Sequence, residues 1–222
     1  MRRLVAFIFT AAILGARLSS AAERPAVEQS VTVQIHDYAQ VPNDSLSSAT
    51  AMVSRMYEKI GVRLEWTGVL RQGDRRAKSE HREDTSQPAV AQMTIIILTP
   101  KMAAKGQVAE GVLGFAAVAV EGMGGICYAI FDRVRAVALS IPTNESQVLG
   151  FVMAHEIGHL LLPRGSHSTR GLMRDNWDVR DLRRIDLMRL QFSEEQAGLI
   201  RTTIENESSR LLARRESQLI ER

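Results

Sequence analysis

The chain has only one cysteine, Cys127, among its 222 residues. A single thiol cannot form an intrachain disulfide, so a small disulfide-stapled fold is excluded. Cys127 lies in the apolar run 124–130, which favours a small buried side chain over a reactive thiol. The chain also lacks an internal repeat, and its length predicts one domain with a core of its own.

The chain has little net charge once its first residues are set aside. Of its 28 basic residues, Arg2, Arg3 and Arg17 precede residue 23, and the remainder balances 25 basic against 25 acidic residues. The basic isoelectric point therefore gives no indication of nucleic-acid binding, and we expect none. No run of 18 apolar residues follows the N-terminal segment, so we expect no membrane span in the mature chain.

The N-terminal segment has the three parts of a secretory signal peptide. Met1–Arg3 is basic, Leu4–Gly15 is apolar but too short to span a membrane, and Ser19–Ala22 offers small residues for cleavage. We therefore predict that residues 1–22 are a signal peptide and that residues 23–222 form a single domain. The protein is expected to be secreted or periplasmic.

Hydrophobic periodicity predicts an α+β order of elements. We expect strands at 30–38, 62–66, 93–98, 112–120 and 126–131, and helices at 45–60, at 143–161 and from a capping box at 193–196 onward. The continuous apolar run 93–98 is typical of a strand covered on both faces. Residues 71–87 are expected to form a long surface loop, with a Gly-rich turn at 121–125. Periodicity does not distinguish strand from helix at 134–141.

Residues 155–159 read His-Glu-Ile-Gly-His. On a helix, positions i and i+4 share a face, so His155 and His159 can direct ring nitrogens at one zinc ion. Glu156 lies beside them without competing as a ligand, which is where a general base for a metal-activated water belongs. The preceding run 148–154 is apolar throughout, which predicts a buried helix rather than a surface helix with two solvated histidines.

A third histidine, His167, follows the helical pair, and Gly171-Leu172-Met173 comes soon after it. In this arrangement the stretch 155–173 resembles the zincin metallopeptidases, and among them the metzincins. The resemblance implies a twisted mixed sheet that backs the motif helix, so we expect a zincin-like α+β fold with a helical C-terminal part. It also implies three zinc ligands, one general base and one turn methionine: His155, His159, His167, Glu156 and Met173.

The third histidine comes two residues later than in the metzincin pattern. The places where that pattern has its glycine and its histidine are taken by Leu162 and Gly165. Pro163 disfavours helix at Leu162, so we expect the motif helix to end there. Gly165 can take the positive φ needed to turn the chain back toward the metal.

Two features of this region have alternative interpretations. If His167 is not the third ligand, Asp175 or Asp178 can supply an oxygen, because carboxylates also bind zinc. Met173 can equally be an ordinary core residue.

These features predict a zinc-dependent endopeptidase that acts on peptides or proteins, with Zn²⁺ as cofactor. The resemblance also implies an edge strand that borders the cleft and can hold an extended peptide by backbone hydrogen bonds, and the strand expected at 112–120 is our candidate for it. Two other functions stay open: a non-catalytic zinc-binding or interaction domain on the same scaffold, and a zinc hydrolase of a non-peptide amide. Glu156 argues against the first, because a structural zinc site has no use for that carboxylate and prefers four closed protein ligands.

Overall fold

The structure is a computed structural model that describes residues 29–71, 92–118, 125–177 and 190–220. The predicted signal peptide, most of the expected loop at 71–87, the start of the turn at 121–125 and Asp178 lie outside the described residues. Within the described ranges, no helix has both the length and the apolar character needed to cross a membrane.

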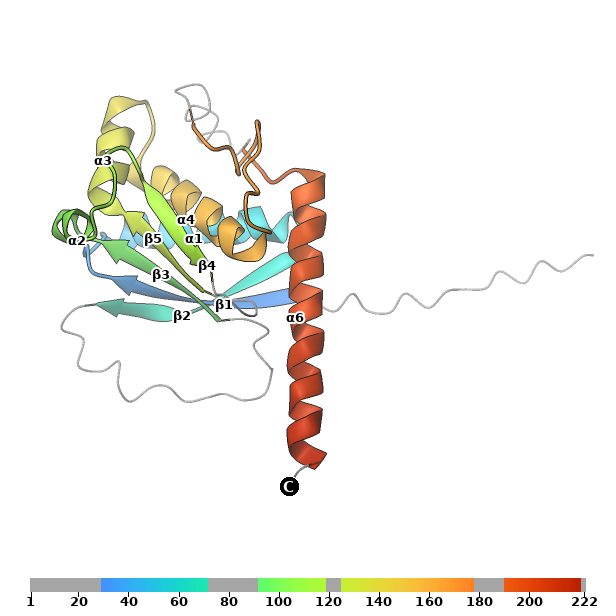
Figure 1. Cartoon of the computed structure of the whole chain (residues 1–222). Coiled ribbons are helices and arrows are strands. Elements are labelled where there is room, and N and C mark those ends of the chain that lie inside the picture. The colour runs from blue at the N-terminus through green and yellow to red at the C-terminus, as the bar shows by residue number, and fades with distance from the viewer. Residues whose placement is uncertain (1–28, 72–91, 119–124, 178–189, 221–222) are drawn as a thin grey trace, which may run out of the picture.

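The described strands form one sheet of five, in the order β2-β1-β3-β5-β4 (Figure 1). The strands are β1 Gln29–Asp37, β2 Val62–Arg71, β3 Gln92–Leu98, β4 Gly114–Val118 and β5 Gly125–Ile130. All neighbours pair in parallel except β4, which runs antiparallel to β5 at the edge. This is the mixed sheet that the sequence predicts, and the strand expected at the edge lies there.

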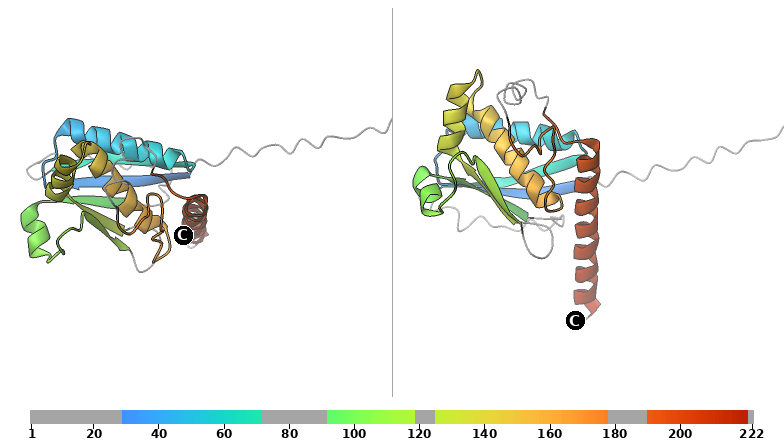
Figure 2. Two further views of the ribbon diagram at one scale, coloured as in Figure 1. Left: turned by 90° about the horizontal axis from the view of Figure 1, so that it is seen from above. Right: turned by 45° about the horizontal axis from the view of Figure 1, so that its top comes forward.

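The helices are α1 Asn43–Glu58, α2 Pro100–Lys105, α3 Phe131–Ser140, α4 Glu145–Leu161 and α6 Glu194–Ile220. Helix α4 packs on β3, β4 and β5 and has α1 and α3 as neighbours, so these three helices share one side of the sheet (Figure 2). The main core lies between this helical layer and the sheet. The α+β fold expected from the sequence is confirmed.

The structure resolves one local ambiguity and corrects one local expectation. The run at 134–141, which periodicity left undecided, lies mostly in α3, where Val134 and Ala138 are buried one turn apart. Strand β3 is not evenly covered on both faces, because Met93, Ile95 and Ile97 are buried whereas Thr94 and Ile96 are half-buried. The outer face of β3 is apolar because it packs beside a smaller cluster that includes Leu98, Ala103 and Ile130.

Helix α4 begins and ends where its sequence predicts. Asn144 caps its start: its side chain accepts a hydrogen bond from the Gln147 N–H, and the Gln147 side chain accepts one from the Asn144 N–H. At the other end Leu162 is extended, with φ −101° and ψ 154°, because Pro163 excludes the helical conformation there. Residues 148–158 between these ends are all buried, and the apolar run at 148–154 predicted a buried helix here.

Helix α6 begins at the predicted capping box, in which Ser193 and Gln196 exchange hydrogen bonds between side chain and backbone. Its first turns bury Ala197, Ile200 and Ile204 against the core. The helix then runs past the start of β1 and projects beyond the sheet (Figure 1). Leu212, in the projecting part, is 53% exposed, so this part contributes little to the core.

Candidate metal centre

The three predicted histidines lie together although they come from two segments. His155 and His159 project from one face of α4, and His167 reaches them from the loop that follows the helix. The Nε2 atom of His159 lies 3.0 Å from Nε2 of His155 and 3.0 Å from Nε2 of His167. One ligand atom from each of the three side chains lies within 4.8 Å of the others, so the cluster has the dimensions of a single-ion site.

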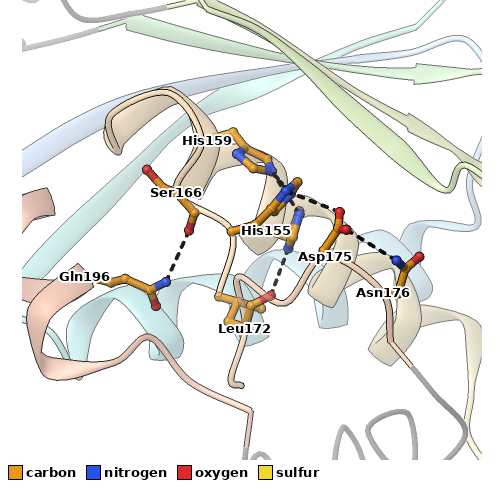
Figure 3. A network of polar contacts seen from close by, with 8 residues as sticks. His155, His159, Ser166, Leu172, Asp175, Asn176 and Gln196 are labelled. Carbon is orange, nitrogen blue, oxygen red and sulfur yellow. Dashed lines mark hydrogen bonds and ion pairs between the residues drawn. The ribbon is translucent and has the colours of Figure 1, made fainter. Parts of the chain in front are cut away.

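The outer nitrogens of two of these rings have partners that fix their tautomers. Nδ1 of His155 lies 2.8 Å from the carbonyl oxygen of Leu172, and Nδ1 of His167 lies 3.3 Å from a carboxylate oxygen of Asp175 (Figure 3). Because carbonyl and carboxylate oxygens only accept hydrogen bonds, both Nδ1 atoms carry the hydrogen. The Nε2 atoms of these two rings face the third histidine.

Burial keeps the two helical imidazoles neutral. Burial lowers the pKa of His155 to about 4, against a partial opposing effect of the Leu172 carbonyl. Burial, together with the two neighbouring imidazoles, likewise lowers the pKa of His159 to about 4. Both rings are therefore in the neutral form that metal binding requires near neutral pH.

This donor set fits a zinc ion. The Nε2 atom of His159 can carry at most one hydrogen. It can therefore donate a hydrogen bond to only one of the two Nε2 atoms that face it. Tetrahedral zinc with Zn–N bonds near 2.0–2.1 Å implies N···N separations of about 3.3 Å, close to those of the cluster. Three protein nitrogens leave a fourth position open, which is the ligand count of catalytic rather than structural zinc sites.

Glu156 lies next to this cluster in an apolar setting. The residue is only 6% exposed, and its Oε2 atom has no hydrogen-bond partner among the residues that the structure describes. Burial raises the pKa of Glu156 to about 8 in the metal-free protein. A nearby divalent cation favours the charged form and so would oppose this effect.

The edge strand approaches Glu156 closely. A Cβ built on Gly114 would lie 2.8 Å from Oε1 of Glu156, 2.7 Å from a Val152 methyl carbon and 2.7 Å from the Tyr128 carbonyl oxygen. Only glycine fits this position, so the backbone of β4 reaches the side of α4 directly. Helix and strand line the same cleft, which has a volume of about 800 Å³ and contains all three histidines and Glu156.

Backbone hydrogen bonds hold the loop that carries His167. Gly165 has φ +77°, the conformation expected where the chain turns back. Ser168 N–H donates to the Met173 carbonyl, and Leu172 N–H donates to the Gln191 carbonyl. Gln196, at the start of α6, donates to the Ser166 carbonyl at 3.4 Å (Figure 3). The capping residue of α6 thus also contacts the loop of the third histidine.

Met173 lies under the motif helix, fully buried. A Cβ built on Gly158 would come within 2.6 Å of its sulfur and 3.1 Å of Phe192 Cε1. Gly158, inside the His-Glu-Ile-Gly-His stretch, therefore leaves the space into which Met173 packs. Met173 is therefore a core residue in contact with the helix that carries the histidines.

Some contacts of the centre have no signal in the sequence. Asp175, considered as an alternative ligand, lies at the outer nitrogen of His167, where a carboxylate orients an imidazole. The Leu172 contact uses a backbone carbonyl, which any residue type supplies. Trp177 packs edge-on against His155, with ring centroids 5.0 Å apart. Cys127 is a fully buried free thiol whose pKa burial raises, and it is not in the histidine cluster.

Comparison with known proteins shows likeness in the fold but not in the sequence. No protein-family profile and no curated protein sequence matches the chain. A zinc-dependent peptidase from Methanocorpusculum labreanum superposes with a TM-score of 0.50 and 12% identity, over 76% of this chain and 99% of that one. The chain thus has the fold of a zinc-dependent peptidase structure.

Two further structures are similar at lower scores. Archaemetzincin from Methanopyrus kandleri matches with a TM-score of 0.46 and 12% identity, over 82% of this chain and 99% of its own. Metalloproteinase-II from Bacteroides fragilis matches with a TM-score of 0.45 and 11% identity, over 79% of this chain. This chain spans 53% of that structure.

The contact between Gly158 and Met173 predicts opposite outcomes for two alanine substitutions. Gly158→Ala inserts a methyl group into the Met173 sulfur, and we expect it to lower the free energy of unfolding by about 1–3 kcal/mol. Gly198→Ala, in helix α6, meets no atom within 4 Å and should raise it by about 0.5–1 kcal/mol. Urea unfolding of the two variants measures both values. Equal and small effects would show that the helix and Met173 are not tightly packed.

The raised pKa of Glu156 predicts a pH-dependent stability in the metal-free protein. Folding raises this pKa from 4.5 to about 8, so its contribution to stability is complete below about pH 4.5 and is lost as the pH rises through 8. We expect Glu156→Gln, which cannot ionise, to gain stability relative to the wild type across this window, by at most about 1.4 kcal/mol per pH unit. Urea unfolding of both metal-free proteins near pH 5 and near pH 8.5 tests this. A difference that does not change with pH contradicts it.

Proposed function

We propose that the protein is a zinc-dependent endopeptidase in which His155, His159 and His167 hold the metal and Glu156 is the general base. The observation that carries the proposal is the convergence of three ring nitrogens: the Nε2 atoms of His155 and His167 each lie 3.0 Å from that of His159. The likeness in fold to a zinc-dependent peptidase supports the choice of metal and reaction class.

The residues of this chain divide the chemistry among them. A bound zinc ion supplies Lewis acidity, since it lowers the pKa of a coordinated water to about 7 and polarises a carbonyl group. Glu156 accepts a proton from the attacking water through its carboxylate and later delivers that proton to the leaving amine. Leu172 and Asp175 hold the His155 and His167 rings in orientation through their Nδ1 atoms.

An extended peptide is the substrate that the cleft suits. Strand β4 has β5 on one side and is the last strand of the sheet on the other, and its residues Gly114–Ala116 line the cleft beside Glu156. An edge strand offers backbone N–H and C=O groups to which a substrate backbone can add as a further strand. The substrate would then lie across the histidine cluster.

Two rival functions are distinguishable from this one. A non-catalytic zinc domain would have no use for the buried carboxylate of Glu156. Its Oε2 atom has no hydrogen-bond partner among the described residues. Hydrolysis of a non-peptide amide would use the same residues and differs only in the substrate. A casein-cleavage assay with and without a chelator separates peptidase activity from both alternatives.

We also propose that the protein is exported through the signal peptide at 1–22 and acts outside the cytoplasm. This proposal rests on the sequence of that segment alone. N-terminal sequencing of exported protein should find a start at residue 22 or 23, and a retained Met1 would contradict it.

Substitutions in the centre should separate metal binding from proton transfer. Glu156→Gln removes the base but no ligand, so we expect casein cleavage to fall by at least about 100-fold while one zinc per chain remains bound. His167→Ala removes a ligand, so zinc content should fall together with activity. Zinc is measured by atomic emission on the purified mature protein.

Matched variants control this experiment. His36→Ala, on β1 outside the cluster, should change neither zinc content nor activity. Asp175→Asn removes only the orienting carboxylate, and we expect zinc affinity to weaken by about 10–100-fold. Full activity in Glu156→Gln would reject the assignment of the base, and unchanged zinc affinity in His167→Ala would reject the third ligand.

A further inference from the structure

Arg133, at the start of α3, makes three hydrogen bonds to one loop. Its Nη1 atom donates to the carbonyl oxygens of Ala109 and Val112, each at 2.6 Å, and its Nη2 atom donates to the Val108 carbonyl at 3.1 Å. All three acceptors are backbone carbonyls in the segment 106–113, between α2 and β4. A guanidinium is a planar fork of donors, which suits several carbonyls converging on one point.

Backbone hydrogen bonds to α2 hold only the first residues of this segment, from the Gly106, Gln107 and Val108 N–H groups to the carbonyls of Met102, Ala104 and Ala103. The segment contains two residues with positive φ, Gln107 at 52° and Gly111 at 84°, and its own backbone bond from Val112 N–H to Ala109 is long at 3.4 Å. Both residues of this bond, Ala109 and Val112, also accept a hydrogen bond from Arg133 through their carbonyl oxygens. Beyond Val108, the guanidinium of Arg133 is therefore the main group that closes the turn at 109–112.

The same segment forms a wall of the cleft. Its residues 110–113 line the cavity that contains the histidines, and the chain continues without a break into β4. Leu113 accepts a hydrogen bond from Ile130 N–H at 2.8 Å, and the next residue is Gly114, which abuts Glu156. A change in this segment would therefore displace the entry to the edge strand and the side of the cleft next to the proposed base.

We propose that Arg133 is a positioning residue for substrate binding: it fixes the segment 106–113 and thereby the start of β4 at the distance from Glu156 that an extended peptide needs. This inference rests on the proposed function. Arg133 touches neither the histidine cluster nor Glu156 through any hydrogen bond or ion pair found among the described residues, so it acts only through the backbone of the segment. Loss of Arg133 should weaken substrate binding more than it slows the chemical step.

The test compares three variants of the mature, zinc-loaded protein. Arg133→Gln removes the fork, and we expect KM for a peptide substrate to rise about tenfold while kcat changes less than about threefold. Arg133→Lys keeps the charge with a single ammonium and should give an intermediate KM. Arg135→Gln is the matched control, because Arg135 lies on the same helix but pairs with Glu145 instead. It should leave KM unchanged.

Hydrogen exchange supplies a readout that does not depend on activity. In Arg133→Gln the amides of residues 108–118 should exchange faster, while those of α1 and β1 keep their wild-type rates. Unchanged KM and unchanged exchange would overturn the proposal, as would a uniform rise in exchange over the whole chain. If Arg133→Gln does not fold, the same two readouts on Arg133→Lys decide the matter.

The failure of the proposed function has a different signature. A wild-type protein that binds zinc but cleaves no peptide rejects the endopeptidase, and with it the substrate-binding role of Arg133. Faster exchange at 108–118 in that case would show only that Arg133 orders the segment.

Discussion

The burial of polar groups on helix α4 is the constraint on which this structure depends. His155 and Glu156 are each less than a tenth exposed, because the helix lies between the sheet, its neighbouring helices and the loop that returns after it. Buried polar atoms without partners cost free energy. The Leu172 carbonyl satisfies one nitrogen of His155, but the opposite nitrogen faces another imidazole. The proposed metal would relieve that cost, and its binding would then be coupled to folding.

The sequence predicted most of the scaffold, and the reason differs from one element to the next. Helix α4 was predictable because its cap, its apolar run and Pro163 all agree on its limits. The region now seen as α3 was ambiguous, since an apolar run of eight residues fits both a strand and a helix. The sequence of β3 is typical of a strand covered on both faces, because Ile96 on its outer face is also apolar. Ile96 packs against a small second cluster on that side.

The centre was predictable only in part, for a physical reason. The spacing of His155 and His159 on a helix fixes their common face, and the turn at Gly165 follows from the residue type. The partners of the outer nitrogens come instead from tertiary folding of the loop, where one is a backbone carbonyl and the other is Asp175. Arg133 likewise looks like an ordinary surface arginine in the sequence, because its acceptors are carbonyl oxygens that no residue type reveals.

The cleft therefore has walls of two kinds. Helix α4 contacts β4 at Gly114 and contacts Met173 at Gly158. Both contacts are close because glycine has no side chain. The segment 110–113 and the turn at 163–165 also line the cleft, and Gly111 and Gly165 meet no atom within 4 Å of a built Cβ.

This division determines where related chains could diverge. A substitution at Gly114 or Gly158 enlarges a residue in a place without room. At the rim, Gly111 and Gly165 meet no neighbour, but their positive φ strains any larger residue, whereas Glu110 and Arg164 are exposed and have no such restriction. For the proposed peptidase, selectivity would therefore change at Glu110 and Arg164 while the reactive centre stays unaltered.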